Sequence, residues 1–190
     1  MSVRTAAARN RKATPEVLLK ALVDLYPEVR TAAAENERVT PEVLLNALQN
    51  DDLDVRHAAA GNERATPEVL LKALQNDDPD VRWAAAGNGR ATPEVLLKAV
   101  EDDNPGVRRA AARNESATPE VKTKYVLRYY LEMGRFPEGS LITPAAISAL
   151  VRDQRVDLER LGDQIESSPF RNNKFIRASI QLEKKRREKQ

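Results

Sequence analysis

Five arginines stand 26 residues apart in this chain, each directly after a valine, a spacing that suits a repeated anionic ligand. They are Arg4, Arg30, Arg56, Arg82 and Arg108. One cation in each layer of a repeated structure can follow a phosphate backbone, as in a nucleic-acid-binding protein. The alternative is a structural ladder, because Asp54 and Asp80 stand two residues before Arg56 and Arg82. Residues 1–120 carry 16 Lys and Arg against 20 Asp and Glu, a net charge of −4, which favours the structural interpretation.

Residues that could perform catalysis are scarce. The chain has one histidine, His57, and no cysteine, which excludes disulfides, zinc thiolates, iron–sulphur clusters and a cysteine nucleophile. It contains no GxSxG, HExxH or glycine-rich phosphate loop. Its many carboxylates recur at equivalent positions of a repeat, which suits solubility better than acid–base chemistry. We therefore expect a non-catalytic protein that uses no metal and no cofactor.

The position that follows each Val-Arg pair varies more than the rest of the repeat. It reads Thr5, Thr31, His57, Trp83 and Arg109, and the position four residues later reads Arg9, Glu35, Gly61, Gly87 and Arg113. Aromatic and arginine side chains are enriched at binding hot spots. We predict that a protein or peptide binds along a strip formed by Thr31, His57, Gly61, Trp83, Gly87, Arg109 and Arg113. The alternative is that Trp83 fills a gap beside a neighbouring layer and that His57 is an ordinary surface residue.

A helical projection predicts which way Trp83 points. At about 100° per residue, Ala84 and Ala85 fall on the same side as Val81, which we assign to the core. The other side receives Arg82, Trp83, Ala86 and Gly87. We therefore expect Trp83 and His57 to stand beside a patch of small residues formed by Ala60, Gly61, Ala86 and Gly87.

A repeat of 26 residues must position these side chains. Val-Arg begins at 3, 29, 55, 81 and 107, and Thr-Pro-Glu-Val begins at 14, 40, 66, 92 and 118. Each unit predicts two short helices, which start at a capping residue followed in most cases by proline. Neither helix is long enough to be stable alone, so the units must stack as a solenoid, and no segment has the alternation of a strand. One asparagine per unit, Asn10, Asn36, Asn62, Asn88 and Asn114, is expected to form a structural turn with a left-handed backbone.

The recurring pattern VRxAAAxN, followed by ATPEVLLxAL and an acidic turn, resembles the leucine-rich repeat variant family. The resemblance covers residues 1–121 and implies alternating α- and 3₁₀-helices in a right-handed superhelix without a sheet. Some members of that family carry an iron–sulphur cluster on cysteines, which this chain lacks. We therefore expect an all-α, right-handed solenoid of five 26-residue units over residues 1–121.

The repeat ends near Val121, and residues 122–190 predict a helical C-terminal cap with a basic tail. KTKYVLRYYLEM forms one longer helix that stops at Gly134, and two further helices precede Ser168-Pro169. Residues 171–190 hold 8 Lys and Arg against 2 Asp and Glu. We expect the end to be a solvated, fraying helix, and residues 184–190 to be dispensable for folding. The alternative is that its cations Lys184, Lys185, Arg186 and Arg187 bind nucleic acid together with Arg30, Arg56, Arg82 and Arg108.

The first layer is predicted to be a weak point, because no cap is apparent before Val3. Val23, Leu25 and Tyr26 either fold back over this open end or contact a second copy in a weak homodimer. The first residues carry charge where a signal peptide needs an apolar run, and no stretch reaches the ~18–20 apolar residues that span a membrane. We expect a cytoplasmic protein without membrane contact.

Overall fold

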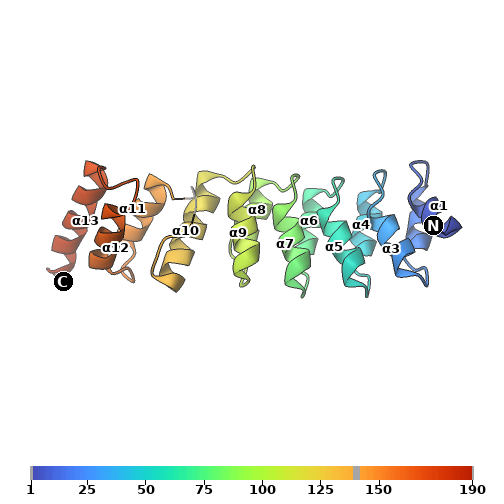
Figure 1. Ribbon diagram of the computed structural model, residues 1–190, viewed down its shortest axis with the longest axis horizontal. Helices are drawn as coiled ribbons and strands as arrows, with labels where there is room; N and C mark the ends of the chain where they lie inside the picture. Colours follow the sequence, from blue (N-terminus) through green and yellow to red (C-terminus); the bar gives the residue numbers. More distant parts are fainter. Residues whose placement is uncertain (1, 139–141, 190) are drawn as a thin grey trace. The chain divides into compact units, whose positions relative to one another are not determined.

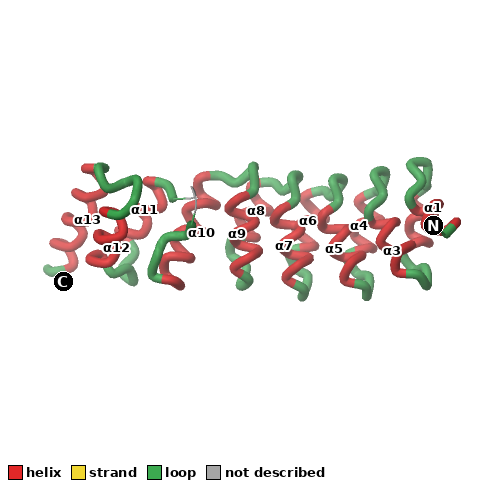
Figure 2. The backbone as a smooth tube through the Cα atoms, viewed as in Figure 1, coloured by secondary structure: helices red, strands yellow, loops and turns green. Residues whose placement is uncertain are grey.

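The computed structural model describes residues 2–138 and 142–189. Within these residues the chain forms thirteen α-helices and no strand, so the predicted all-helical class is confirmed (Figure 2). The helices divide into an N-terminal unit, Met1–Ala117, and a C-terminal unit, Thr118–Gln190. The resemblance to the leucine-rich repeat variant family implied alternating 3₁₀-helices, but every helix of the described residues is α-helical.

The N-terminal unit consists of two rows of helices. The first row contains α1 (Val3–Ala8), α3 (Pro27–Ala34), α5 (Leu53–Gly61), α7 (Pro79–Gly87) and α9 (Pro105–Arg113). The second row contains α2 (Pro15–Ala21), α4 (Pro41–Ala47), α6 (Pro67–Ala73) and α8 (Pro93–Ala99). Each helix packs against the next member of its own row, and the first row lies side by side in chain order (Figure 1).

The second-row helices start in the same way at every repeat. A threonine precedes a proline, and its side chain accepts a hydrogen bond from the amide of the valine three residues later; the threonines are Thr14, Thr40, Thr66 and Thr92. Such a cap stabilises a helix by about 0.5–2 kcal/mol, and proline fits the first helical turn because no amide partner is required there. These signals, visible in the sequence, set the helix starts.

A ladder of valines and leucines forms the core between the two rows. Leu44, Leu70 and Leu96 have no exposed surface, and Val55 and Val81 are equally buried. A fully buried leucine or valine contributes about 1.5–3 kcal/mol relative to an exposed one. The equivalent valine of the first layer, Val3, is 87 % exposed.

The first helix is better anchored than the sequence predicted. Ser2 caps α1, because its hydroxyl accepts a hydrogen bond from the amide of Thr5 at 3.1 Å. The expectation of an uncapped start is therefore wrong, because the hydroxyl of Ser2 takes up an amide of the first helical turn.

The recurring asparagines join successive layers. The side-chain amide nitrogen of Asn88 donates to the carbonyls of Ala60 at 2.8 Å and Asn62 at 3.0 Å. Its oxygen accepts from the amide of Arg90 at 2.9 Å. The same bridge to a carbonyl 28 residues earlier is made by Asn36, Asn62 and Asn114. The structural role is as predicted but the left-handed backbone is not, since no described residue other than glycine has a positive φ.

In the part of the C-terminal unit that the structure describes, the chain forms four helices. They are α10 (Pro119–Met133), α11 (Pro144–Arg152), α12 (Leu158–Glu166) and α13 (Lys174–Arg187). Gly134 ends α10 with φ of 63°, a left-handed conformation that favours glycine, as the sequence predicted. The core includes Ile147, Leu150, Leu161 and Ile165, all of which are fully or almost fully buried.

The basic end of α13 is docked. The guanidinium of Arg187 donates to the carbonyls of Val156 at 2.7 Å, Asp153 at 2.8 Å and Val151 at 3.3 Å. The ammonium of Lys184 lies 2.7 Å from the carboxylate of Glu159. The prediction of a solvated, fraying end is therefore wrong, because carbonyls at the end of α11 and in the loop after it bind the Arg187 side chain. No helix of the described residues is long and apolar enough to cross a membrane.

Candidate binding surface

Helix α7 divides into a buried side and an outer side. Val81 and Ala85 are completely buried, whereas Trp83 is 51 % exposed and Gly87 is also exposed. Trp83 and Gly87 are four residues apart and therefore lie on one face of the helix, about one turn from each other.

The buried half of Trp83 faces the next layer. A β-carbon placed on Gly106, in the first turn of α9, would lie 4.0 Å from Cδ1 of the indole. The ring thus has a packed edge and an exposed remainder. Trp83 as a binding residue and Trp83 as a residue that fills a gap beside the next layer both stay predictions.

The equivalent positions of neighbouring layers share this outer face. His57 and Gly61 on α5 and Arg109 and Arg113 on α9 are exposed, and Thr31 on α3 is partly exposed. Because each helix packs against the next in its row, these positions form two parallel lines across α3, α5, α7 and α9. The surface formed by Thr31, His57, Gly61, Trp83, Gly87, Arg109 and Arg113 is called the outer strip below.

The small-residue patch is narrower than the sequence predicted. Ala60 and Ala86 are completely buried, and only Gly61 and Gly87 remain at the surface. The prediction that placed Ala86 outside was wrong because each helix is covered by neighbours on two sides as well as by the second row. A β-carbon at Gly61 or Gly87 would meet no atom within 4 Å, so both positions have room for a side chain.

An open groove of about 760 Å³ lies between α3 and α5. Thr31, His57 and Gly61 line it, together with the acidic side chains Glu35, Glu37, Asp54 and Glu63 and the basic side chain Arg64. Glu35 and Glu37 lie 3.9 and 2.9 Å from Arg9 and Arg11, in exposed ion pairs. Among the described residues, Asp54 and Glu63 have no ion-pair partner. The groove therefore presents two free carboxylates beside the outer strip.

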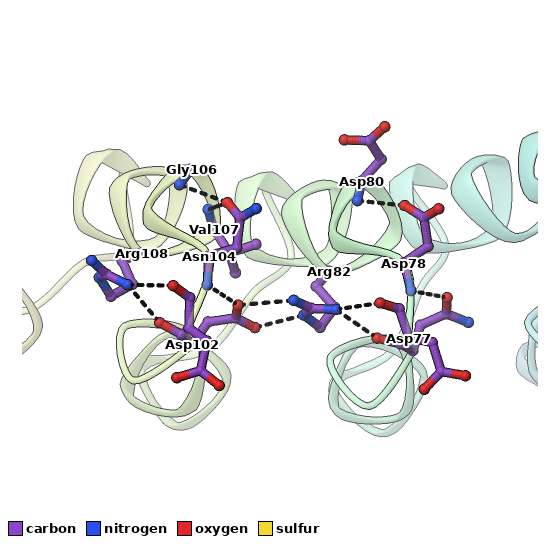
Figure 3. Close-up of polar contacts among 11 residues, drawn as sticks. Asp77, Asp78, Asp80, Arg82, Asp102, Asn104, Gly106, Val107 and Arg108 are labelled. Atoms are coloured by element: carbon purple, nitrogen blue, oxygen red, sulfur yellow. Dashed lines mark hydrogen bonds and ion pairs between the residues drawn. The ribbon is translucent and has the colours of Figure 1, made fainter.

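The arginine ladder lies at the turns between layers rather than on the outer strip. Arg82 donates from Nη1 to the carbonyls of Asn76 and Asp77, and from Nε and Nη2 to the carboxylate of Asp102 (Figure 3). Arg30, Arg56 and Arg108 bind two carbonyls of their own turns in the same way. The hydrogen bond with Asp102 raises the pKa of Arg82 above its ordinary value. Asp54 and Asp80, which the sequence suggested as partners, do not pair with Arg56 and Arg82.

Arg56 differs from its equivalents. Its Nε is buried and has no hydrogen-bond partner among the described residues. Arg4 pairs with Asp24 and Arg82 with Asp102, whereas the corresponding position for Arg56 is Asn76. Arg30 also has an asparagine, Asn50, at this position, but it pairs with Asp52 at 2.7 Å. Among the described residues Arg56 has an asparagine at this position and no ion pair in its place.

The cations of the tail are only partly available to a ligand. Arg187 and Lys184 are occupied by the contacts within the C-terminal unit, whereas Lys185 and Arg186 are exposed. Arg186 lies 3.4 Å from the carboxylate of Glu183.

Apolar side chains remain exposed at the first turn of the N-terminal unit. Val23 is 80 % and Leu25 is 82 % exposed, so neither folds back over the first layer. The guanidinium carbon of Arg4 lies 4.6 Å from the centre of the Tyr26 ring. The homodimer through this end stays a prediction.

No protein-family model matches the chain. No curated protein matches it either.

Within residues 2–138 and 142–189, no group of three or more histidine and carboxylate side chains is arranged to hold a metal ion.

Proposed function

We propose that the N-terminal unit is a non-catalytic scaffold that binds a protein or peptide on the outer strip. The observation that carries this proposal is the half-exposed Trp83 next to the bare backbone of Gly87. A large, rigid aromatic ring beside a backbone without side chains offers apolar contact at a small cost in side-chain entropy. Repeat proteins commonly bind partners on one extended face, with variable positions on a constant framework.

The variation of residue type along the strip supports a role in binding rather than in packing. The framework positions keep valine, alanine, asparagine and leucine in unit after unit, whereas the strip changes from threonine to histidine, tryptophan and arginine. Packing explains the constant positions, because they are buried or bonded between layers. Packing does not explain why exposed His57 and Trp83 differ from the equivalent Thr31.

The nucleic-acid alternative has weaker support. The guanidinium groups of Arg30, Arg56, Arg82 and Arg108 donate to carbonyls of their own turns, which leaves fewer donors for phosphate. In the tail, Arg187 is bonded to three carbonyls. A phosphate-binding surface needs clustered, available cations.

We further propose that the N-terminal unit is a right-handed solenoid of five 26-residue units of the leucine-rich repeat variant type. The two rows of helices, the repeated threonine caps and the asparagine bridges between layers support this proposal. In it, residues 122–190 are a helical extension that does not continue the repeat.

Selection from a random-peptide library tests the binding proposal. Wild-type protein should enrich peptides that lose binding to Trp83→Ala and to Gly87→Arg, because the first removes the ring and the second fills the surface beside it. The matched control is Lys98→Ala, since Lys98 is an exposed residue on α8 and lies outside the strip. Enriched peptides that bind the wild-type protein and all three variants equally would place the binding site elsewhere. Peptides displaced by duplex DNA with a steep salt dependence would instead favour the nucleic-acid alternative.

A further inference from the structure

The outer strip changes its chemical character from one layer to the next. At α3 and α5 it adjoins the groove that presents the carboxylates of Asp54 and Glu63. At α7 it presents the indole of Trp83, and at α9 it presents the exposed guanidinium groups of Arg109 and Arg113. A ligand that matches the whole strip must therefore be basic at one end, apolar in the middle and acidic at the other end.

The spacing of the layers selects the conformation of such a ligand. Packed helices lie about 8–10 Å apart, so equivalent positions of adjacent layers recur at that distance. A polyproline II helix has three residues per turn and rises about 3.1 Å per residue, so every third side chain returns to one face after about 9.3 Å. A β-strand returns to the same face after about 6.6–6.8 Å and an α-helix after about 5.4 Å per turn, and both fall short of the layer spacing.

The middle of the strip suits proline. Aromatic side chains form the docking surface for polyproline II segments in several unrelated domains, because a proline ring packs flat on an aromatic face. Trp83 supplies the ring, and Gly61 and Gly87 have no β-carbon, with open space above them. A peptide backbone can therefore approach α5 and α7 closely on both sides of the indole.

We propose that the outer strip binds a polyproline II segment of about ten residues, the length that crosses the three steps from α3 to α9. A lysine or arginine of the segment enters the groove between α3 and α5 and pairs with Asp54 and Glu63. A proline lies on Trp83, and an aspartate or glutamate pairs with Arg109 and Arg113. The proposal rests on the proposed function and specifies the chemistry of its ligand.

Synthetic peptides test the spacing directly. The probe has four anchors in the order arginine, proline, proline and glutamate, with two alanines between successive anchors. The control has the same four anchors with one alanine between them. Trp83 is the only tryptophan of the chain, so its fluorescence reports ligand contact at the strip, and titration calorimetry gives the affinity. The probe should bind about tenfold or more tightly than the control, which corresponds to about 1.4 kcal/mol of lost anchor contacts.

A charge-reversal variant tests the two ends. Arg109→Glu combined with Arg113→Glu should prefer a peptide with arginine at both ends over the original probe, because both ends of the strip are then acidic. Lys72→Glu combined with Lys98→Glu makes the same charge change at two exposed positions outside the strip, and it should keep the original preference. A polyproline II helix can bind in either direction, so the test gives the two ends of the strip the same charge rather than exchanging the ends.

Three results would overturn this inference. Equal affinity for the two spacings would show that layer spacing does not select the ligand. If library-selected peptides bind at Trp83 while the patterned probe does not bind, the polyproline II segment is wrong and the binding function stands. If no selected peptide depends on Trp83 and the probe also fails, both proposals are wrong.

Discussion

Arg82 and Asp102 form a two-point ion pair that joins α7 to the turn before α9. The Nε of Arg82 lies 2.7 Å from Oδ2 of Asp102, and Nη2 lies 3.1 Å from Oδ1. The side chains are only 17 % and 10 % exposed. The same carboxylate accepts a hydrogen bond from the amide of Asn104, so a single group fixes both the helix and the turn.

Replacing Asp102 by asparagine should separate the ion pair from the turn. The asparagine oxygen can still accept from the amide of Asn104, whereas the charge that faces Arg82 is lost. We expect the free energy of unfolding to fall by about 1–3 kcal/mol, the cost of removing a charged hydrogen bond from a mostly buried partner. Urea unfolding followed by circular dichroism measures it. Asp77→Asn, the same change at an exposed position, is the control, and an equal loss in both would contradict a special role for the pair.

The opposite change at the equivalent position should stabilise the protein. Asn76→Asp would place a carboxylate near Arg56, whose Nε is buried without a hydrogen-bond partner. The turn should persist, since the Asn76 oxygen already accepts from the amide of Asp78 at 3.1 Å and an aspartate oxygen can do the same. We expect a gain of about 0.5–1 kcal/mol in urea unfolding, and less at high salt. The double variant Asn76→Asp, Arg56→Lys should lose most of that gain because lysine has no donor at Nε; retention of the full gain would assign it to the turn alone.

The asparagine bridges predict a strong dependence of stability on Asn88. Asn88→Ala removes two donors to the carbonyls of Ala60 and Asn62 and one acceptor for the amide of Arg90. We expect unfolding to become easier by about 2–4 kcal/mol, since these backbone groups lose buried partners. Asn46→Ala is the matched control, because Asn46 is exposed and bonds only within its own helix. A cost below 1 kcal/mol at Asn88, roughly one ordinary hydrogen bond, would mean that water replaces the bridge.

The docked end of α13 gives a reason to expect that the tail contributes to stability, although the dispensability of residues 184–190 stays a prediction. Arg187→Ala should destabilise the C-terminal unit by about 1–3 kcal/mol, because the carbonyls of Val151, Asp153 and Val156 lose their common donor. Thermal unfolding followed by circular dichroism measures the loss. Lys185→Ala, at an exposed position two residues earlier, should leave the melting temperature nearly unchanged. A tail without effect at either position would restore the original expectation.

The sequence predicted what depends on local signals and missed what depends on distant contacts. Threonine and proline set the helix starts within four residues of chain, and Gly134 ends α10 for the same local reason. The bridge from Asn88 reaches a carbonyl 28 residues away, and Arg187 reaches residues more than 30 positions earlier. The acceptors are backbone carbonyls, and the residue types around them do not show that a distant side chain will bind there.

On the candidate surface, too, the sequence predicted the features that depend on one helix and missed those that depend on several. The helical angle between Val81 and Trp83 was sufficient to predict that Trp83 is exposed, because both belong to one helix. The burial of Ala86 could not be predicted from that angle, since it depends on how closely α5 and α9 approach α7. The groove between α3 and α5 requires the positions of two helices and of the loops that follow them.

Trp83→Ala tests the surface that the proposed function requires. The indole is about half exposed and one edge packs towards Gly106, so truncation should cost about 1–2 kcal/mol of stability, less than the ~3–5 kcal/mol of a fully buried aromatic side chain. Binding of a strip ligand should weaken by about 2 kcal/mol or more, as expected for a central aromatic anchor. Arg82→Ala is the neighbouring control: Arg82 belongs to the ladder, so its loss should lower the free energy of unfolding and leave the affinity of the folded protein nearly unchanged. Urea unfolding and calorimetric titration with a library-selected peptide measure the two quantities on the same variants. If Trp83→Ala unfolds the protein while Arg82→Ala only weakens binding, the ligand contacts the turn side of α7, where Arg82 lies, and the outer strip is part of the framework.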